Sequence, residues 1–506
     1  MITFIIGLAI LIVGGALYGA LCQKVFSPDN RKTPAYTKAD GVDYVAMPKW
    51  KNSLINLLNI AGTGPILGPI QGILFGPIAF ITIPIGCVIG GAMHDYFSGM
   101  ISVREGGIQM PEMIKLNTNA AIHKLYTVFV CLVTFLVGVV FIYTPGDIMA
   151  TQVFGFGGTA DEASTWIIYS CIFIYYLVAA VLPIDKIIGK VYPLFGAVLL
   201  LSAVGVFIML FVKGYPLSEI WGSWTLNGFD FGAYFSSENF IPTFFITVAC
   251  GILSGFHSTQ ITLVTRTMKH EKEGRFTFYN MMLVEGFIAM VWAAGTMAMI
   301  SAGAGDMGIT MQQTEKGWGY FMLVEGQLKQ ISATSVVGVV CKNMLGSVGG
   351  IIAVIGVIVL PITSGDTALR SVRLILAETF HVKQNKGLKR LALAIPIFAL
   401  AYVTLILAKV NPNGFNIVWR YFGWSNQTVA IFALASILIW LMQHDKKKYL
   451  WIPLIPLVFY SFVTCSYLMG ASIGFSLSYE VSMIIGLTFA ALVAALAIYR
   501  GNKKKA

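Results

Sequence analysis

Charged residues are scarce in this 506-residue sequence. Only 11% of the residues are Asp, Glu, Lys or Arg, whereas 57% are hydrophobic, and the mean hydropathy is +0.77. A soluble domain needs a polar surface that this composition does not provide, so a soluble globular fold is excluded. The composition predicts an all-α, polytopic membrane protein.

Residues with metal-binding or catalytic chemistry are also few. The seven cysteines include no CxxC pair, and the six histidines show no ligand spacing. This argues against disulfides, a structural metal or a bound cofactor, and we interpret the cysteines as small apolar core residues. A membrane enzyme would need a convergent nucleophile, base or metal cluster, which the pattern does not offer. The motif GxxxxGK[ST] is absent, which excludes a P-loop ATPase.

Long apolar runs occupy most of the chain. By the length that a helix needs to cross the hydrocarbon layer, we count about thirteen spans. We interpret the first as an extra helix, because it lacks the basic start of a cleaved signal. The predicted spans are residues 2–22, 54–76, 77–101, 123–143, 166–183, 191–212, 240–263, 278–302, 347–369, 389–409, 426–442, 450–470 and 480–499.

Basic residues are distributed unevenly between the loops. With the N-terminus outside, 28 of the 34 Lys and Arg fall in segments on the cytoplasmic side. Cytoplasmic loops retain Lys and Arg, so this distribution predicts an outer N-terminus and a cytoplasmic C-terminus. The net charge of +11 then reflects topology and contact with anionic lipids, and it does not indicate nucleic-acid binding.

Two of the spans are interrupted by helix-breaking residues. The sequence IAGTGPILGP occupies residues 60–69, and GILSGFH occupies residues 251–257. Such breaks free backbone groups that hydrocarbon cannot hydrogen-bond, so they persist only where they are buried in protein or line a watery cavity. The alternative is a packing kink, because Gly and Pro are common in membrane helices. Paired breaks in two halves of a chain are typical of a transporter's substrate site.

The order of the spans predicts an inverted repeat. After the extra helix and a cytoplasmic loop (1–53), five spans (54–212) precede five more (240–442), and accessory helices follow (450–506). The first broken helix starts inside and the second outside, which predicts a single domain with the LeuT-type 5+5 inverted repeat. Transport would be secondary, since no ATP-binding motif is present. A channel would instead show repeated pore-lining motifs.

Four ordered motifs resemble the carbon starvation protein A (CstA) family. They are IAGTGPILGP at 60–69, ACGILSGFHS at 249–258, DTALRSVR at 366–373 and WSNQTVA at 424–430. The resemblance covers about residues 50–440. It implies a bacterial or archaeal cytoplasmic-membrane importer of small molecules, with peptides as the substrate during nutrient limitation and pyruvate–proton symport as the alternative. It also implies H⁺ as the coupling ion in preference to Na⁺.

The two breaks supply most of the predicted substrate-binding residues. A half-helix terminus exposes amides and carbonyls that bind a carboxylate or a cation. His257 either bonds to neighbouring backbone or contacts substrate or a coupled proton. Asn426 and Gln427 either bind a peptide or cap and pack a helix. The complete predicted set is Ala61, Gly62, Thr63, Gly64, Gly68, Gly251, Ser254, Gly255, His257, Ser258, Asn426 and Gln427.

A second predicted set, for ion coupling or gating, begins near the end of the ninth span. Thr363, Asp366, Thr367 and Arg370 share one helical face. A pair between Asp366 and Arg370 would stabilise both charges, and the alternative is an ordinary helix end with a snorkelling Arg. By the LeuT-type resemblance, Thr363 and Ser364 could complete a sodium site with the first broken helix.

The remaining predicted coupling residues are Asp95 and Lys190. Asp95 is interpreted either as a gate that pairs with a cytoplasmic basic residue or as a substrate contact. Its neighbour His94 is offset by about 100° on the helix, so the two are not expected to pair. Lys190 either replaces a sodium ion or anchors the helix on the cytoplasmic side. The outer segment 302–346 is expected to form a lid or to lie on the membrane surface.

Overall fold

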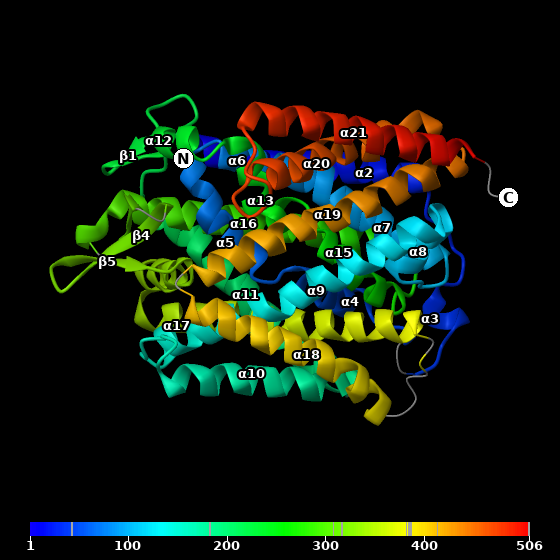
Figure 1. Cartoon of the computed structure of the whole chain (residues 1–506), viewed down its shortest axis with the longest axis horizontal. Coiled ribbons are helices and arrows are strands. Elements are labelled where there is room, and N and C mark those ends of the chain that lie inside the picture. The colour runs from blue at the N-terminus through cyan, green and yellow to red at the C-terminus, as the bar shows by residue number, and fades with distance from the viewer. Residues whose placement is uncertain are drawn as a thin grey trace.

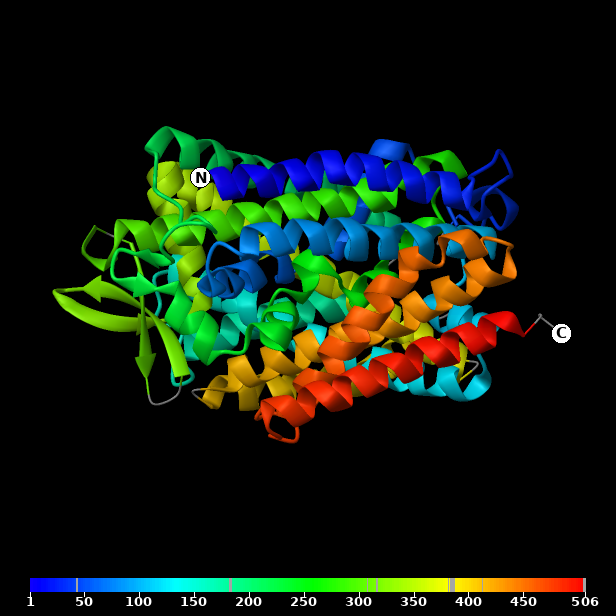
Figure 2. The same cartoon turned by 90° about the horizontal axis from the view of Figure 1, so that it is seen from above.

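The computed structural model is an elongated helical bundle. It describes residues 1–41, 44–181, 184–306, 308–314, 317–380, 382, 387–411 and 413–503. Most helices run along the long axis of the molecule (Figure 1). The N-terminus and a small β-sheet lie toward one end, and the C-terminus lies at the other (Figure 2).

The helices of the first half begin with α1 (Ile2–Ala9) and α2 (Gly15–Phe26), which a π-helical stretch joins into one span. The short α3 (Pro34–Thr37) follows. The next helices are α4 (Lys49–Ile60), α5 (Gly64–Gly72), α6 (Ala79–Gly86), α7 (Ala92–Arg104), α8 (Met110–Asn117), α9 (Ala120–Ile148), α10 (Ala163–Val181) and α11 (Ile184–Lys213).

The second half follows a short hairpin, β1 (Thr225–Leu226) and β2 (Phe229–Asp230), and the helix α12 (Phe231–Ser237). Its helices are α13 (Phe240–Thr247), α14 (Ala249–Ile252), α15 (Gly255–Thr265), α16 (Met281–Ala302), α17 (Ala333–Thr379), α18 (Gly387–Val410) and α19 (Gly414–Gln443). The chain ends in α20 (Trp451–Gly470) and α21 (Tyr479–Asn502), which pack on each other and on α19.

Fewer membrane spans are recognised in the structure than the sequence predicts. Among the described residues, ten helices are long and apolar enough to cross a membrane, and the bent pair α4–α5 makes eleven. The predicted span 166–183 corresponds to α10, whose apolar part is short, and the span 240–263 is divided among α13, α14 and α15. A criterion based on helix length does not count short or divided helices. The number of thirteen spans therefore stays a prediction.

The first break lies between α4 and α5. α4 ends at Ile60, α5 begins at Gly64, and the two helix axes differ by 49°. Pro65 suits the first turn of α5, because its missing amide hydrogen would have no partner there. The expected interruption is confirmed, but it is narrower than the 60–69 motif. Only 61–63 lie between the helices, and Gly68 is part of α5.

The second break lies between α14 and α15, where Leu253 and Ser254 are extended. α14 packs against α5, so the two broken helices meet. This close approach depends on glycine. A Cβ atom on Gly64 would overlap the Cys250 side chain, and one on Gly68 would come within 2.9 Å of the Thr247 carbonyl oxygen.

The segment between α16 and α17, which the sequence predicts to lie outside, forms a three-stranded antiparallel sheet. Its strands are β3 (Thr310–Thr314), β4 (Gly317–Val324) and β5 (Gln327–Ile331). Tyr320 of β4 is buried, and its hydroxyl donates a hydrogen bond to the Ile70 carbonyl in α5. The sheet therefore packs on the first broken helix, and the choice between a lid and a segment on the membrane surface stays open.

Replacing Tyr320 with Phe tests whether the sheet stabilises the first broken helix. Tyr320→Phe leaves the buried Ile70 carbonyl without this donor, and we expect a loss of about 1 kcal/mol in the free energy of unfolding. Thermal unfolding of the purified protein measures the effect. Tyr36→Phe is the control, because the Tyr36 side chain is 48% exposed. Equal unfolding temperatures for the two variants would show that the contact contributes nothing.

Candidate functional site

The second broken helix is held by two side chains of α19, one at the break and one on α13. The side-chain oxygen of Asn426 accepts hydrogen bonds from Ser254 Oγ (3.1 Å) and from the Phe256 amide (2.8 Å). Gln427 Nε2 donates to the Phe245 carbonyl (2.6 Å). Both amide side chains are fully buried. Since a broken helix leaves backbone groups without partners, these contacts match the capping interpretation, although the cap serves a neighbouring helix.

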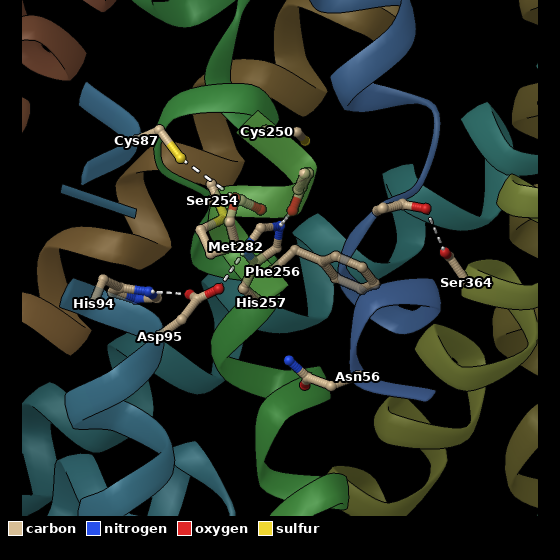
Figure 3. Close-up of polar contacts among 12 residues, drawn as sticks. Asn56, Cys87, His94, Asp95, Cys250, Ser254, Phe256, His257, Met282 and Ser364 are labelled. Atoms are coloured by element: carbon tan, nitrogen blue, oxygen red, sulfur yellow. Dashed lines mark hydrogen bonds and ion pairs between the residues drawn. The ribbon is translucent and has the colours of Figure 1, made fainter. Parts of the chain in front are cut away.

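The first break is held by α17. Ser364 Oγ donates to the carbonyl oxygens of Leu58 (2.8 Å) and Ala61 (3.4 Å), where α4 ends (Figure 3). Helix ends leave such carbonyls without intrahelical partners. Ser364 therefore contacts the first broken helix, and the sodium site stays a prediction. The Thr363 hydroxyl, however, donates to the Leu360 carbonyl of its own helix (2.8 Å).

Two polar atoms beside the first break have no hydrogen-bond partner among the described residues. They are Asn59 Oδ1 and Thr63 Oγ1, and both residues are 2% exposed. A buried polar atom without a partner is unfavourable, so a ligand or water is expected to meet these two. Thr63 was predicted as a substrate contact. Asn59 was not, although an amide side chain directly before the Gly-rich motif was a visible signal.

Four titratable side chains are enclosed beside the second break. Asp95 on α7 lies 2.8 Å from His94 Nδ1 and 2.9 Å from His257 Nδ1, and Figure 3 shows the two rings on either side of it. His257 Nε2 lies 3.5 Å from Glu285 Oε2 on α16. All four side chains are fully buried. His257, on α15, thus bridges two carboxylates that come from different helices.

The expectation that His94 and Asp95 do not pair is wrong. An offset of about 100° separates the directions in which their Cβ atoms leave the helix, but both side chains are long enough to meet across it. An ion pair between Asp95 and a cytoplasmic basic residue, one of its two interpretations, is not found among the described contacts. Burial of Asp95 within the bundle, beside α15, places it next to histidine instead.

Glu285 was not among the residues predicted from the sequence. It lies within the predicted span 278–302, where an acidic side chain is unfavourable unless it has a partner or a function. Neither of its carboxylate oxygens has a hydrogen-bond partner among the described residues. The same criterion that singled out His257, an ionisable residue inside an apolar run, would have found Glu285.

The predicted coupling face of α17 is described only in part. The side chains of Asp366 and Lys190 lie outside the described residues. Arg370 is buried rather than snorkelling, and its guanidinium donates to the Ala179 carbonyl near the end of α10 (2.8 Å). The Thr367 hydroxyl donates to the Ser364 carbonyl (3.0 Å). The predicted pair between Asp366 and Arg370 therefore stays a prediction.

The remaining predicted substrate residues lie at the two breaks and are buried. Ser258 Oγ donates to the Gly255 carbonyl at the start of α15 (2.6 Å). A Cβ atom on Gly62 would overlap the Phe141 ring, and one on Gly251 would approach Ala289 within 2.9 Å. Both breaks are thus enclosed by protein in this conformation.

The comparison that decides the family covers most of the chain. A family model described as carbon starvation protein CstA matches residues 1–155, 135–332 and 327–467. The chain belongs to the CstA family.

Two curated relatives place this CstA-family protein among membrane proteins. The peptide transporter CstA of Escherichia coli is 26% identical over an alignment of 555 positions, gaps included, which covers 88% of this chain and 77% of the relative. An uncharacterized membrane protein of Haemophilus influenzae is 40% identical over 331 residues, which cover 58% of this chain and 89% of the relative. The CstA-family chain is a multi-pass membrane protein whose named relatives are transporters.

Solved structures show the fold. A crystal structure of the manganese transporter of Eremococcus coleocola superposes with a TM-score of 0.58 at 10% identity, covering 91% of this chain and 98% of that one. MhsT in complex with L-phenylalanine gives 0.57 at 12% identity, covering 90% and 99%. The predicted LeuT-type fold is therefore confirmed. At such low identity the neighbours' ligands do not carry over to this chain.

Proposed function

We propose that this CstA-family protein is a proton-coupled secondary transporter that imports short peptides across the cytoplasmic membrane. Its relatives that are named peptide transporters support the substrate class. One observation supports the coupling: His257 lies between Asp95 and Glu285 on a helix that begins at the second break. A proton on this ring would affect the contacts of α15 with both α7 and α16.

Protonation of His257 would join α15 to α7 and α16. An imidazole donates from both nitrogens only when it carries two protons. In that state Nδ1 donates to Asp95 and Nε2 faces Glu285. A neutral ring leaves one carboxylate facing a nitrogen without a hydrogen, which is unfavourable away from water. Proton binding would therefore favour the closed arrangement, and proton release would favour its opening.

The two breaks are the proposed substrate site. α5 and α15 both begin there, and helix N-termini attract carboxylates such as the one that ends a peptide. Thr63 and Asn59 add polar atoms that no described protein group satisfies. The division into 1–53, 54–212, 240–442 and 450–506 remains part of the proposal.

Uptake into proteoliposomes tests the proposal. Alanylalanine and pyruvate are compared under a pH gradient alone and under a sodium gradient alone. We expect alanylalanine to accumulate under the pH gradient, and a one-unit gradient with one proton per peptide would support an accumulation of about tenfold. Accumulation of pyruvate alone would favour the symport alternative. Accumulation under sodium alone would contradict proton coupling and favour a sodium site at Ser364.

Asp366 remains a proposed coupling residue. If Asp366 exchanges between a protonated state and an ion pair with Arg370, it links the pH gradient to the opening and closing of the transporter on the cytoplasmic side. We expect Asp366→Asn to lose gradient-driven accumulation of alanylalanine while retaining exchange of labelled for unlabelled peptide. Glu480→Gln, in the first turn of α21, is the control. An Asp366→Asn protein that accumulates peptide as the parent does would reduce Asp366 to a helix-end residue.

A further inference from the structure

A cavity with charged and polar residues in its wall lies beside the outer half of the second broken helix. It has a volume of about 200 Å³, and a second cavity of about 300 Å³ adjoins it, with Arg420 and Ser472 lining both. Pro242 and Thr243 of α13 form part of the wall of the first cavity. The charge distribution assigns this end of the bundle to the outside. The cavities therefore lie where a solute would approach α13 before it reaches the break.

The wall of the first cavity contains one acidic and one basic side chain that do not form an ion pair with each other. Arg420 of α19 is exposed, and Glu238, between α12 and α13, is half-buried. Among the described residues, neither belongs to an ion pair within 4.0 Å, so they do not neutralise each other. A cavity with a separated carboxylate and guanidinium suits a ligand that carries an ammonium and a carboxylate.

A third polar group in the wall also lacks a partner. Ser466 of α20 lines the same cavity, is 1% exposed, and its hydroxyl has no hydrogen-bond partner among the described residues. Buried hydroxyls are normally hydrogen-bonded, so this one indicates a missing ligand or water. Together the two cavities reach the size of sites that hold small molecules.

We propose that the cavity between Glu238 and Arg420 is an outer docking site for a zwitterionic solute. Its ligand class is a short peptide with free ends, the ammonium facing Glu238 and the carboxylate facing Arg420. The choice of a peptide rests on the proposed function, because a lipid headgroup with an amine and a phosphate carries the same two charges. The docked peptide would then pass along α13 to the break.

Protection of an introduced thiol tests this site without requiring transport. Ser472→Cys places a thiol in the wall of both cavities, and a membrane-impermeant thiol reagent labels it in the purified full chain, with the parent chain as the blank. We expect alanylalanine to slow labelling, and its N-acetyl and amide derivatives to do so at about tenfold higher concentrations, because each loses one charged contact. Arg420→Gln and Glu238→Gln should each raise the required alanylalanine concentration by a similar factor.

Matched controls make the result decisive. Lys329→Gln removes an exposed basic residue from the same end of the molecule and should leave protection unchanged. The proposal is overturned if the derivatives protect as well as alanylalanine, or if Arg420→Gln and Glu238→Gln protect as the parent does. It is also overturned if only vesicles containing phosphatidylethanolamine, and not the peptide, slow labelling. Protection without any peptide uptake would support the docking site while contradicting the proposed function.

Discussion

His257→Gln and Glu285→Gln are each expected to abolish proton-driven accumulation of peptide. The parent should concentrate alanylalanine about tenfold for each unit of pH gradient at one proton per peptide. Either variant removes one member of the buried Asp95–His257–Glu285 chain, and the accumulation ratio should fall to about one. Exchange of labelled for unlabelled peptide without a gradient should persist, since that reaction needs the conformational change but no net proton movement.

Accumulation and exchange, measured together, distinguish a loss of proton coupling from a structural defect. His444→Gln is the matched control, because His444 lies at the C-terminal end of α19, outside the cluster, and stacks on Trp440. It should accumulate peptide as the parent does. Loss of both accumulation and exchange in a variant would indicate a structural defect instead. If His257→Gln still accumulates peptide against its gradient, the proton path does not run through this cluster.

Gly255→Leu and Gly64→Leu are expected to abolish uptake while the protein still inserts into the membrane. A Cβ atom on Gly255 would overlap the Asn426 carbonyl oxygen, and one on Gly64 would overlap Cys250. Even alanine is thus too large at either position. Forcing the helices apart is expected to lower the free energy of unfolding by about 1–3 kcal/mol. Because both contacts join a broken helix to a neighbour, the geometry of the substrate site should change before the bundle unfolds.

Transport and membrane yield are measured together for these variants. Gly255→Ala and Gly64→Ala should reduce uptake as well, in contrast to Gly305→Ala, where the added Cβ meets open space. Gly305 also has no left-handed backbone that alanine would strain. Normal uptake by Gly64→Leu and Gly255→Leu would show that the close packing at the breaks is irrelevant to transport.

Local chemistry explains what could be predicted about the site. The Gly and Pro residues at 60–69 and the polar residues after Gly251 disrupt helices through their own backbone properties, so both interruptions were visible. His257 stood out as an ionisable residue in an apolar run. Glu285 gave the same signal and was overlooked. Its significance depends on its partner on α15, His257, which lies 28 residues away in sequence.

Contacts between distant segments could not be predicted. Asn426 reaches the start of α15 across 170 residues, and Ser364 reaches the end of α4 across about 300. The sheet of 310–331 was also missed, because its strands are short and Tyr320 is buried only through packing on α5. A pattern of apolar and polar residues records which face of a segment is buried, but not which segment covers it.

The sequence by itself determined the membrane environment, the two interrupted helices and the inverted order of the halves. Each of these follows from hydropathy, backbone preference or charge distribution along a single stretch of chain. Only the tertiary structure decided that α7, α15 and α16 enclose two carboxylates around His257, and that Glu238 and Arg420 line one cavity. Those arrangements depend on how helices pack against one another, and packing is set by the shape of the whole bundle.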